Sequence, residues 1–164
     1  MWAVLSDSHD NLDAIKLALD TLSSYSIELF FHCGDVISPF TVPKLDMGVP
    51  VKAVRGNNDG EFLGLYKMFQ QFPEWEFTQG VLTVETDYGK VAVTHGHIPG
   101  VLPALLSGSE FKFIFSGHDH NAQVKKVNGI LWANSGECGG WLRGRKTIAV
   151  VDPQKSRAEI IEIK

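Results

Sequence analysis

Cysteine is scarce in this chain. Its 164 residues contain only Cys33 and Cys138, and no Cys-x-x-Cys pair is present. This pattern excludes a disulfide scaffold and speaks against a thiolate zinc site of the usual spacing. We expect both thiols to be reduced and the protein to be cytoplasmic, because disulfides are rare in that compartment.

The chain also has neither a basic excess nor a long apolar segment. Lys and Arg total 15 against 19 Asp and Glu, which gives a formal net charge of -4. Binding of long nucleic acid needs a basic surface, so we expect no such partner. The apolar run from Trp2 to Leu5 is too short for a signal peptide, and no segment approaches the ~20 apolar residues of a membrane span. We therefore expect no membrane association.

The remaining composition suits one globular domain. Hydrophobic residues make up 44% of the chain and charged residues 21%, an ordinary balance for a folded protein. No repeat, low-complexity tract or linker interrupts the sequence. We expect a single domain that covers residues 1–164.

Apolar periodicity predicts two halves with different patterns of helices and strands. In the first half, strands at 2–5, 27–33 and 49–55 alternate with helices at 12–23, 39–46 and 62–72, which indicates a parallel sheet with right-handed crossovers. The second half is richer in strands, with one short helix at 99–106 and an Asn128-Gly129 hairpin. Its predicted strands cover 74–78, 81–85, 91–94, 111–115, 122–127, 130–133, 147–151 and 158–163. The fold class is therefore mixed α/β, with two packed sheets in one domain.

Five of these strands end in the same way, with small residues followed by Asp, Asn or His. Five of the six histidines lie in such loops, which chance placement on a surface would not produce; only His32 lies inside a strand, where we expect a hydrogen-bonded core histidine. Parallel strands bring such loops to one edge of a sheet. The side chains that we expect to meet there are Asp7, His9, Asp35, Asn57, His95, His118 and His120.

Seven side chains of this kind exceed the needs of one ion, since a tetrahedral ion takes four ligands. Two ions that share a bridging carboxylate would use all seven, and Asp35 is the candidate bridge. Imidazole, carboxylate and amide ligands suit Mn²⁺, Fe²⁺, Co²⁺, Ni²⁺ or Zn²⁺. Two such ions roughly 3.5–4 Å apart acidify a shared water and hold two oxygens of a phosphoester for in-line attack.

The same residues carry a resemblance to a known family. Asp7-Ser8-His9, Gly34-Asp35, Gly56-Asn57-Asn58-Asp59, His95-Gly96-His97 and Gly117-His118-Asp119-His120 resemble, in order, the five motifs of the calcineurin-like metallophosphoesterases. Length and spacing are similar to those of the small single-domain phosphodiesterases of bacteria and archaea. The resemblance covers nearly the whole chain.

This resemblance implies a four-layer α-β-β-α sandwich of two mixed sheets, with a dinuclear site at the strand ends. It implies that Asp7, His9, Asp35 and His120 hold one divalent ion, and that Asp35, Asn57, His95 and His118 hold the other. The implied activity is hydrolysis of a small phosphoester by a metal-bridging hydroxide, with Mn²⁺ as the leading candidate for the ions.

One position departs from the family pattern. Many members carry His directly after the metal-binding Asn, where this chain has Asn58, which cannot act as a general acid. The departure favours phosphodiesters or activated esters over phosphomonoesters. His97 is an alternative source of the proton, but a substrate contact or a solvated loop position suits it equally.

Two other functions compete with this hypothesis. A scaffold of the same fold that has lost its chemistry, as in the retromer subunit of the superfamily, is the alternative from a different class, although no ligand is missing here. A nuclease of long DNA would need a basic surface or further domains.

Aromatic residues near Phe69 and Trp75 look exposed in the sequence and leave room for a homodimer or a higher homo-oligomer.

Overall fold

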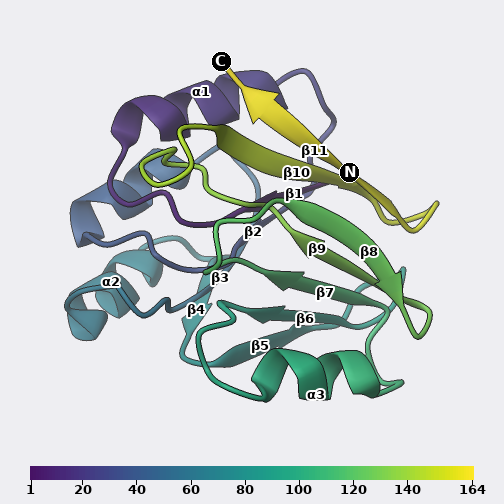
Figure 1. The fold of residues 1–164 in the computed structure, drawn as a ribbon. Helices are drawn as coiled ribbons and strands as arrows, with labels where there is room; N and C mark the ends of the chain where they lie inside the picture. Colours follow the sequence, from purple (N-terminus) through teal and green to yellow (C-terminus); the bar gives the residue numbers. More distant parts are fainter.

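The computed structural model describes residues 1–164 and consists of four layers (Figure 1). The first sheet has six strands in the order β11-β10-β1-β2-β3-β4. Strands β1 to β4 are mutually parallel, and β10 pairs antiparallel with β1 and with β11. The strands of this sheet are β1 (Trp2–Leu5), β2 (Leu29–His32), β3 (Val51–Val54), β4 (Glu76–Thr78), β10 (Lys146–Asp152) and β11 (Arg157–Ile163).

The second sheet has five strands in the order β5-β6-β7-β9-β8. Its centre, β6-β7-β9, is parallel, while β5 and β8 pair antiparallel at the two edges. Both sheets are therefore mixed. The strands of this sheet are β5 (Val81–Val84), β6 (Val91–Thr94), β7 (Phe113–Ser116), β8 (Gln123–Val127) and β9 (Ile130–Asn134).

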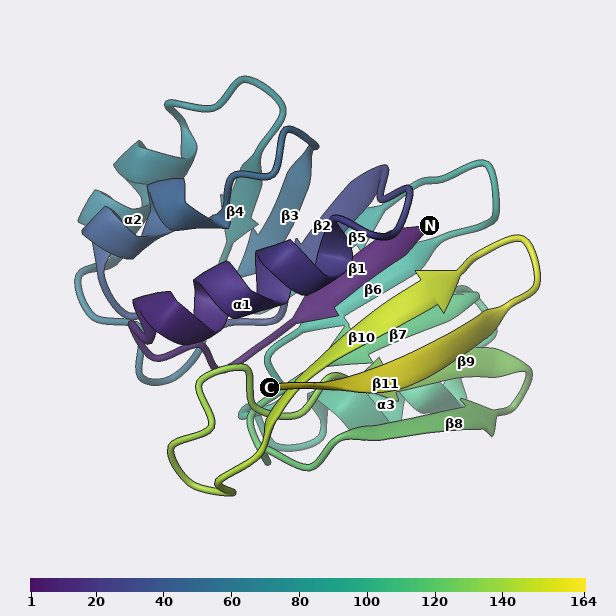
Figure 2. The same cartoon turned by 90° about the horizontal axis from the view of Figure 1, so that it is seen from above.

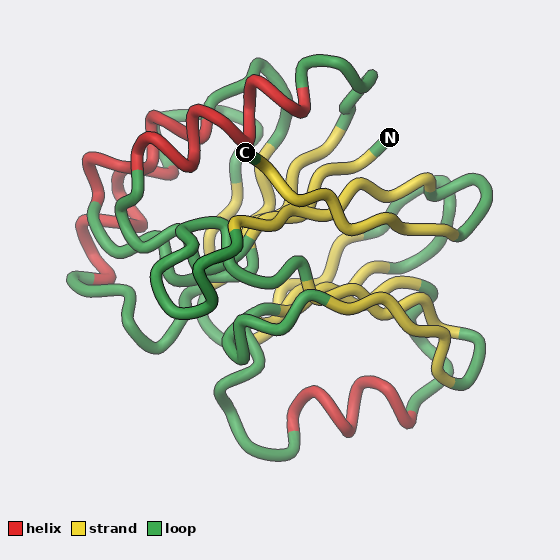
Figure 3. Tube along the Cα trace, turned by 45° about the horizontal axis from the view of Figure 1, so that its top comes forward, coloured by secondary structure: helices red, strands yellow, loops and turns green.

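Helices form the two outer layers (Figure 3). Helix α1 (Leu12–Leu22), the 3-10 helix η1 (Pro39–Leu45) and helix α2 (Phe62–Phe69) cover the outer face of the six-stranded sheet, as Figure 2 shows from above. Helix α3 (Val101–Ser107) covers the outer face of the five-stranded sheet (Figure 1). The predicted four-layer sandwich of two mixed sheets is confirmed.

Alternating side chains of β1 show how the sequence builds these layers. Ala3 and Leu5 point to the helical side, where they join the core beneath α1 and α2. Trp2 and Val4 point the other way, into the core between the two sheets. There the Trp2 ring packs edge-on against Phe113, with ring centroids 5.1 Å apart. A third, smaller core lies between the five-stranded sheet and α3.

Some local predictions differ from the structure. The segment predicted as a short helix at 39–46 is a 3-10 helix, and Pro43 inside it has no N–H to donate to a regular helix. Helix α2 ends at Phe69 instead of residue 72. The expectation that Phe69 is exposed is wrong: it is buried and stacks on Phe77 with centroids 4.7 Å apart. No helix has both the length and the apolar character needed to cross a bilayer.

Backbone hydrogen bonds join the loops that follow the central parallel strands of both sheets. The Asp7 N–H donates to Gly34 O at 3.0 Å, which joins the loops after β1 and β2. The Gly117 N–H donates to His95 O at 3.0 Å, which joins the loops after β7 and β6. The His118 N–H donates to Asp7 Oδ2 at 3.0 Å and links the two sheets. The carboxyl ends of these strands therefore meet at one edge of the sandwich.

Candidate metal centre

The loop after β1 places the first two predicted ligands. The His9 N–H donates to Asp35 O at 3.0 Å, which fixes the loop against the end of β2. Asn11 caps α1 by accepting from the Ala14 N–H at 3.1 Å. Asp10 instead accepts hydrogen bonds from Ser38 and from the Thr41 hydroxyl, and so it holds this loop to the start of η1.

Backbone strain is concentrated at the site. Non-glycine residues with positive φ are uncommon, and where they gather they often mark a functional site. Five of the seven predicted ligands have this conformation, while Asn57 and His95 do not. The five are Asp7 (54°), His9 (46°), Asp35 (59°), His118 (73°) and His120 (56°).

Asp7 lies at the centre of the first ligand group. Its Oδ1 atom is 3.2 Å from Nε2 of His120 and 3.8 Å from Nε2 of His9. Burial by itself would raise the pKa of Asp7, but the adjacent His120 and His9 rings hold it well below its usual range. In turn, the Asp7 carboxylate raises the pKa of both histidines against the effect of burial. Asp7 Oδ1 and His9 Nε2 are buried without a hydrogen-bond partner.

Asp35 lies between the two ligand groups. Its Oδ2 atom is 3.5 Å from Nε2 of His9 and 3.5 Å from Nε2 of His95. This equal spacing is the arrangement that a bridging carboxylate needs. Asp7, Asp35 and His95 also bring one ligand atom each to within 4.8 Å of one another.

His95 and Asn57 form the second group with Asp35. Nδ1 of His95 lies 2.7 Å from Cys33 O, a carbonyl that can only accept, so this nitrogen carries the proton. In the neutral ring, Nε2 then presents its lone pair to Oδ1 of Asn57 at 2.9 Å. Two facing acceptors repel each other, and a cation between them would satisfy both. The hydrogen bond from Nδ1 to Cys33 O, on the far side of the ring from Nε2, is typical of metal-binding histidines.

His118 joins the second group from the loop after β7. Its ring centroid is 5.1 Å from that of His95 and 6.1 Å from that of His97. The side chain is exposed, and it is not among the tightest sets of ligand atoms. The structure thus brings all seven predicted ligands to one edge of the sheets, with His118 at the outer side.

The two candidate catalytic residues lie at the same edge. Asn58 donates from its backbone N–H to Oδ1 of Asp35 and from its side-chain amide to Oδ2, each at 2.8 Å. It therefore holds the carboxylate that lies between the groups. The His97 ring centroid is 5.3 Å from that of His95, and burial lowers the pKa of His97. Its Nδ1 is buried without a partner.

These observations fit divalent cations. The converging donors are two carboxylates, an amide oxygen and four imidazoles, which first-row divalent metals accept. Buried acceptors without a donor, such as Asp7 Oδ1, lose hydrogen bonds that water would supply, and a cation would compensate for the loss. The ligand assignment itself stays a prediction.

Two carboxylates that support the site were missed by the sequence reasoning. Glu137 is buried, with Oε1 3.3 Å from Nδ1 of His120. Asp59 is buried and accepts three backbone N–H groups, those of Asp35, Ile37 and Gly56. Burial nevertheless raises its pKa. The only sequence features that could have pointed to these two residues are the glycine-rich loop around Glu137 and the place of Asp59 in the third motif.

His32 is a hydrogen-bonded core histidine, as predicted. Its Nδ1 accepts from the Gly34 N–H at 3.2 Å, so the neutral ring carries its proton on Nε2. That proton points to the Ser8 hydroxyl at 3.2 Å, and Ser8 in turn donates to Asp35 O at 3.4 Å. Complete burial lowers the pKa of His32 to about 4.

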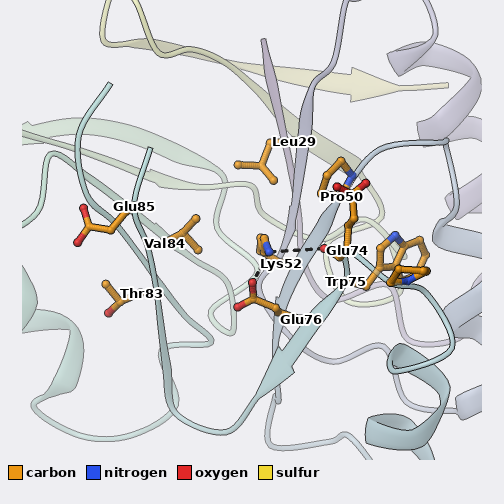
Figure 4. A pocket seen from close by; sticks show the side chains of 10 residues that line it. Leu29, Pro50, Lys52, Glu74, Trp75, Glu76, Thr83, Val84 and Glu85 are labelled. Atoms are coloured by element: carbon orange, nitrogen blue, oxygen red, sulfur yellow. Dashed lines mark hydrogen bonds and ion pairs between the residues drawn. The ribbon is translucent and has the colours of Figure 1, made fainter. Parts of the chain in front are cut away.

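Hollows border the site and also occur away from it. One of about 300 Å³ is lined by Arg55, Asn57 and His97, and one of about 350 Å³ is lined by Asn57, His118 and His120. A hollow of about 540 Å³ lies near the opposite ends of β2 to β4 and contains no predicted ligand (Figure 4). There Lys52 already pairs with Glu76.

Comparison with known proteins agrees with this geometry. The calcineurin-like phosphoesterase superfamily domain matches residues 1–156. Phosphodiesterase MJ0936 of Methanocaldococcus jannaschii is 32% identical over 93% of this chain and 92% of its own length. The probable metallophosphoesterase YsnB of Bacillus subtilis is 28% identical over 81% of this chain and 72% of its own.

Solved structures give the same result. An archaeal phosphodiesterase superposes with a TM-score of 0.92 at 30% identity and 99% coverage of both chains. The phosphoesterase Yfce of E. coli (TM-score 0.66, 19% identity) and Vps29 of Entamoeba histolytica (0.69, 16%) share the fold, each with 99% coverage of both chains. These findings confirm the resemblance found in the sequence: the chain belongs to the calcineurin-like phosphoesterase superfamily and is a phosphoesterase.

Proposed function

We propose that this protein is a divalent-metal-dependent phosphodiesterase with two metal ions. The observation that carries the proposal is the position of Asp35, whose Oδ2 lies 3.5 Å from the ligand nitrogens of both His9 and His95. A carboxylate oxygen that lies beside two imidazole groups can contact a cation at each of them. The name of the archaeal relative, Phosphodiesterase MJ0936, supports the substrate class.

In this proposal Asp7, His9, Asp35 and His120 hold one cation, and Asp35, Asn57, His95 and His118 hold the other. When bound, the two cations acidify water near neutral pH and neutralise charge on the phosphoester. Asp35 is fixed by both donors of Asn58, so its Oδ2 keeps its position between the two groups. His95 is fixed by Cys33 O in the tautomer that presents Nε2. We propose Mn²⁺ first, with Fe²⁺, Co²⁺, Ni²⁺ and Zn²⁺ as alternatives.

The substrate preference follows from Asn58 and His97. Asn58 has no titratable proton, and its amide is already occupied by Asp35. A substrate whose leaving group needs strong protonation is therefore served poorly, which favours diesters with stable leaving groups. His97 is the one imidazole at this edge outside the ligand set, and we assign to it a contact with the substrate. We propose that the substrate is a small phosphoester. We also propose a cytoplasmic location, which the buried free thiols Cys33 and Cys138 fit.

A scaffold role is the competing function. The likeness to Vps29 at 16% identity concerns the fold alone. All seven predicted ligand side chains are present in this chain, and every one of them except His118 lies close to another predicted ligand. The catalytic proposal is therefore the stronger one.

The experiment that tests the proposal compares bis(4-nitrophenyl) phosphate with 4-nitrophenyl phosphate. With Mn²⁺ we expect hydrolysis of the diester, weak hydrolysis of the monoester, and loss of both on addition of chelator. Asp35→Asn should reduce the diester rate at least a hundredfold. Asp20→Asn, which removes an exposed carboxylate of α1 paired with Lys16, is the matched control and should keep the rate. Full activity of Asp35→Asn, or turnover that survives the chelator, would refute the proposal.

A further inference from the structure

Two hollows lie on either side of Asn57 and share it as a wall. The one on the β3 side includes Arg55, Gln79 and His97, and the one on the β7 side includes His118 and Leu142. A phosphodiester carries two substituents on phosphorus. A phosphorus atom held at the predicted ligand groups therefore directs one substituent toward each hollow. This inference rests on the proposed phosphodiesterase function.

The hollow on the β3 side is positive. Arg55 is its only charged side chain, and no Asp or Glu lines it. The guanidinium has no ion-pair partner: Nη2 donates to the backbone O of Asp59 at 3.3 Å, and Cζ lies 5.8 Å from the Phe62 ring centroid. Nε is buried with no hydrogen-bond partner at all. In a chain with a net charge of -4, a half-buried arginine without a carboxylate is free to bind an anion.

The hollow on the β7 side has a different character. Its arginine, Arg143, donates to the backbone O of Asp119 at 3.1 Å, and because Asp119 is also a lining residue the hollow has one negative and one positive side chain. Leu142 lines this side and is 75% exposed. An apolar, uncharged substituent suits this hollow better than an anion.

We propose that the hollow lined by Arg55, Gln79 and His97 is a subsite for an anionic substituent of the phosphodiester, such as a carboxylate or a second phosphate. The Arg55 guanidinium binds the anion, with Gln79 and His97 as further polar contacts. The other substituent lies against Leu142. Arg55 is therefore a specificity-determining residue, and the substrate class is a small phosphodiester with one charged arm.

Two probe diesters test this assignment. 4-Nitrophenyl 3-carboxyphenyl phosphate and 4-nitrophenyl phenyl phosphate release the same 4-nitrophenolate, and they differ only in the charge of the retained arm. With the Mn²⁺-loaded protein we expect kcat/KM for the carboxylated diester to exceed that for the phenyl diester by roughly tenfold, the contribution of one charge-assisted hydrogen bond. A ratio at or below one would overturn the proposal.

Three variants locate the cause of that ratio. Arg55→Gln should bring it close to one, and Arg55→Lys, which keeps the charge, should retain part of it. Arg143→Gln removes an equal charge from the other side of Asn57 and should leave the ratio unchanged. A merely structural role of Arg55 would lower both rates together and keep the ratio, and this result would overturn the proposal. Loss of the ratio in Arg143→Gln alone would assign the anion to the other hollow and overturn it as well.

Calorimetric titration separates failure of the subsite from failure of the proposed function. Phenylphosphonate and 3-carboxyphenylphosphonate are titrated into the Mn²⁺-loaded wild type and Arg55→Gln. Tighter binding of the carboxylated probe to the wild type alone supports the subsite even where neither diester is hydrolysed. Hydrolysis of both diesters with equal binding of the two probes refutes the subsite and leaves the phosphodiesterase proposal standing.

Discussion

At the scale of single residues, the predicted ligands need side chains at positions whose backbone conformation favours glycine. Asp7, His9, Asp35, His118 and His120 have positive φ, where glycine would be favoured. A left-handed conformation costs an L-residue roughly 1–2 kcal/mol. Glycine has no side chain to bind a cation, so a functional ligand set at these positions keeps the strain. No sequence pattern shows this conformation, because Asp and His also occur in ordinary loops.

His118 gives a direct test of this strain. Its side chain is exposed and φ is 73°, so truncation loses little packing. In the presence of chelator, we expect His118→Gly to have a free energy of unfolding about 1 kcal/mol above that of His118→Ala, because only glycine relieves the strain. Urea unfolding of the two variants measures the difference. Equal stability, or a more stable alanine variant, would show that the strain is absent.

His32 predicts a pH dependence of stability. Its pKa is about 4 in the folded protein against 6.5 in the unfolded chain, because burial disfavours the charged ring. Between these values the unfolded state binds more protons. The free energy of unfolding therefore falls as the pH drops from 6.5 to 4, and the stabilisation that depends on a neutral His32 is fully lost below pH 4. This contribution amounts to roughly 3 kcal/mol.

Urea unfolding of wild type and His32→Gln at several pH values in chelator isolates this effect. Contributions of the other titrating groups cancel in the difference between the two proteins. The wild type should lose more stability than the variant between pH 7 and pH 4.5. Parallel curves would mean that His32 does not titrate in this window.

At the scale of elements, the loop between β9 and β10 supports the site from outside the ligand set. Glu137 accepts from the N–H groups of Leu142 and Arg143 at 2.8 and 2.9 Å and so fixes the loop. Its Oε1 also faces Nδ1 of His120 at 3.3 Å, which leaves Nε2 of that ring directed at Asp7. One buried carboxylate thus connects the loop conformation to the direction of a predicted ligand.

Glu137→Gln replaces this carboxylate with an amide of the same shape. The amide presents a weaker acceptor to His120, so we expect metal affinity to fall roughly 10–100-fold, as for other supporting partners of ligand histidines. Titration of the chelator-stripped protein with Mn²⁺ measures the affinity. Glu162→Gln is the control, since Glu162 pairs with Arg145 on the surface. Unchanged affinity in Glu137→Gln would contradict the role given to Glu137.

The elements also show how far the sequence could be read. Apolar runs predicted β1, β2, β3, β6 and β7, and polar residues after them predicted a common site, because a parallel strand has one direction and one exit edge. Glu137, Asp59 and Arg55 could not be assigned in this way. Their roles depend on contacts between segments far apart in the chain, and nothing in their local sequence distinguishes them from ordinary loop residues. The expectation that Phe69 is exposed was wrong for the same reason, because its burial depends on contact with Phe77.

At the scale of the whole molecule, the two sheets are held together both by their shared core and at their edge. The inter-sheet core around Trp2, Phe31 and Phe115 is apolar and does not depend on the site. At the edge, Asp7 and Asp35 from one sheet face His95 and His120 from the other. Cations bound there would join the two sheets, so that metal binding and folding are coupled.

This coupling predicts a metal-dependent melting temperature. A ligand that binds only the folded state at a hundredfold excess over its Kd adds about 2.7 kcal/mol. For a chain of this size that corresponds to a shift of roughly 5–10 °C. Calorimetry of the chelator-stripped protein should show this rise on addition of Mn²⁺. Asp35→Asn should lose most of it, because the variant weakens both predicted ligand groups at once, whereas Asp20→Asn should keep it. A rise of equal size in Asp35→Asn would mean that Mn²⁺ binds elsewhere, and Asp35 would then no longer be the residue that connects the two groups.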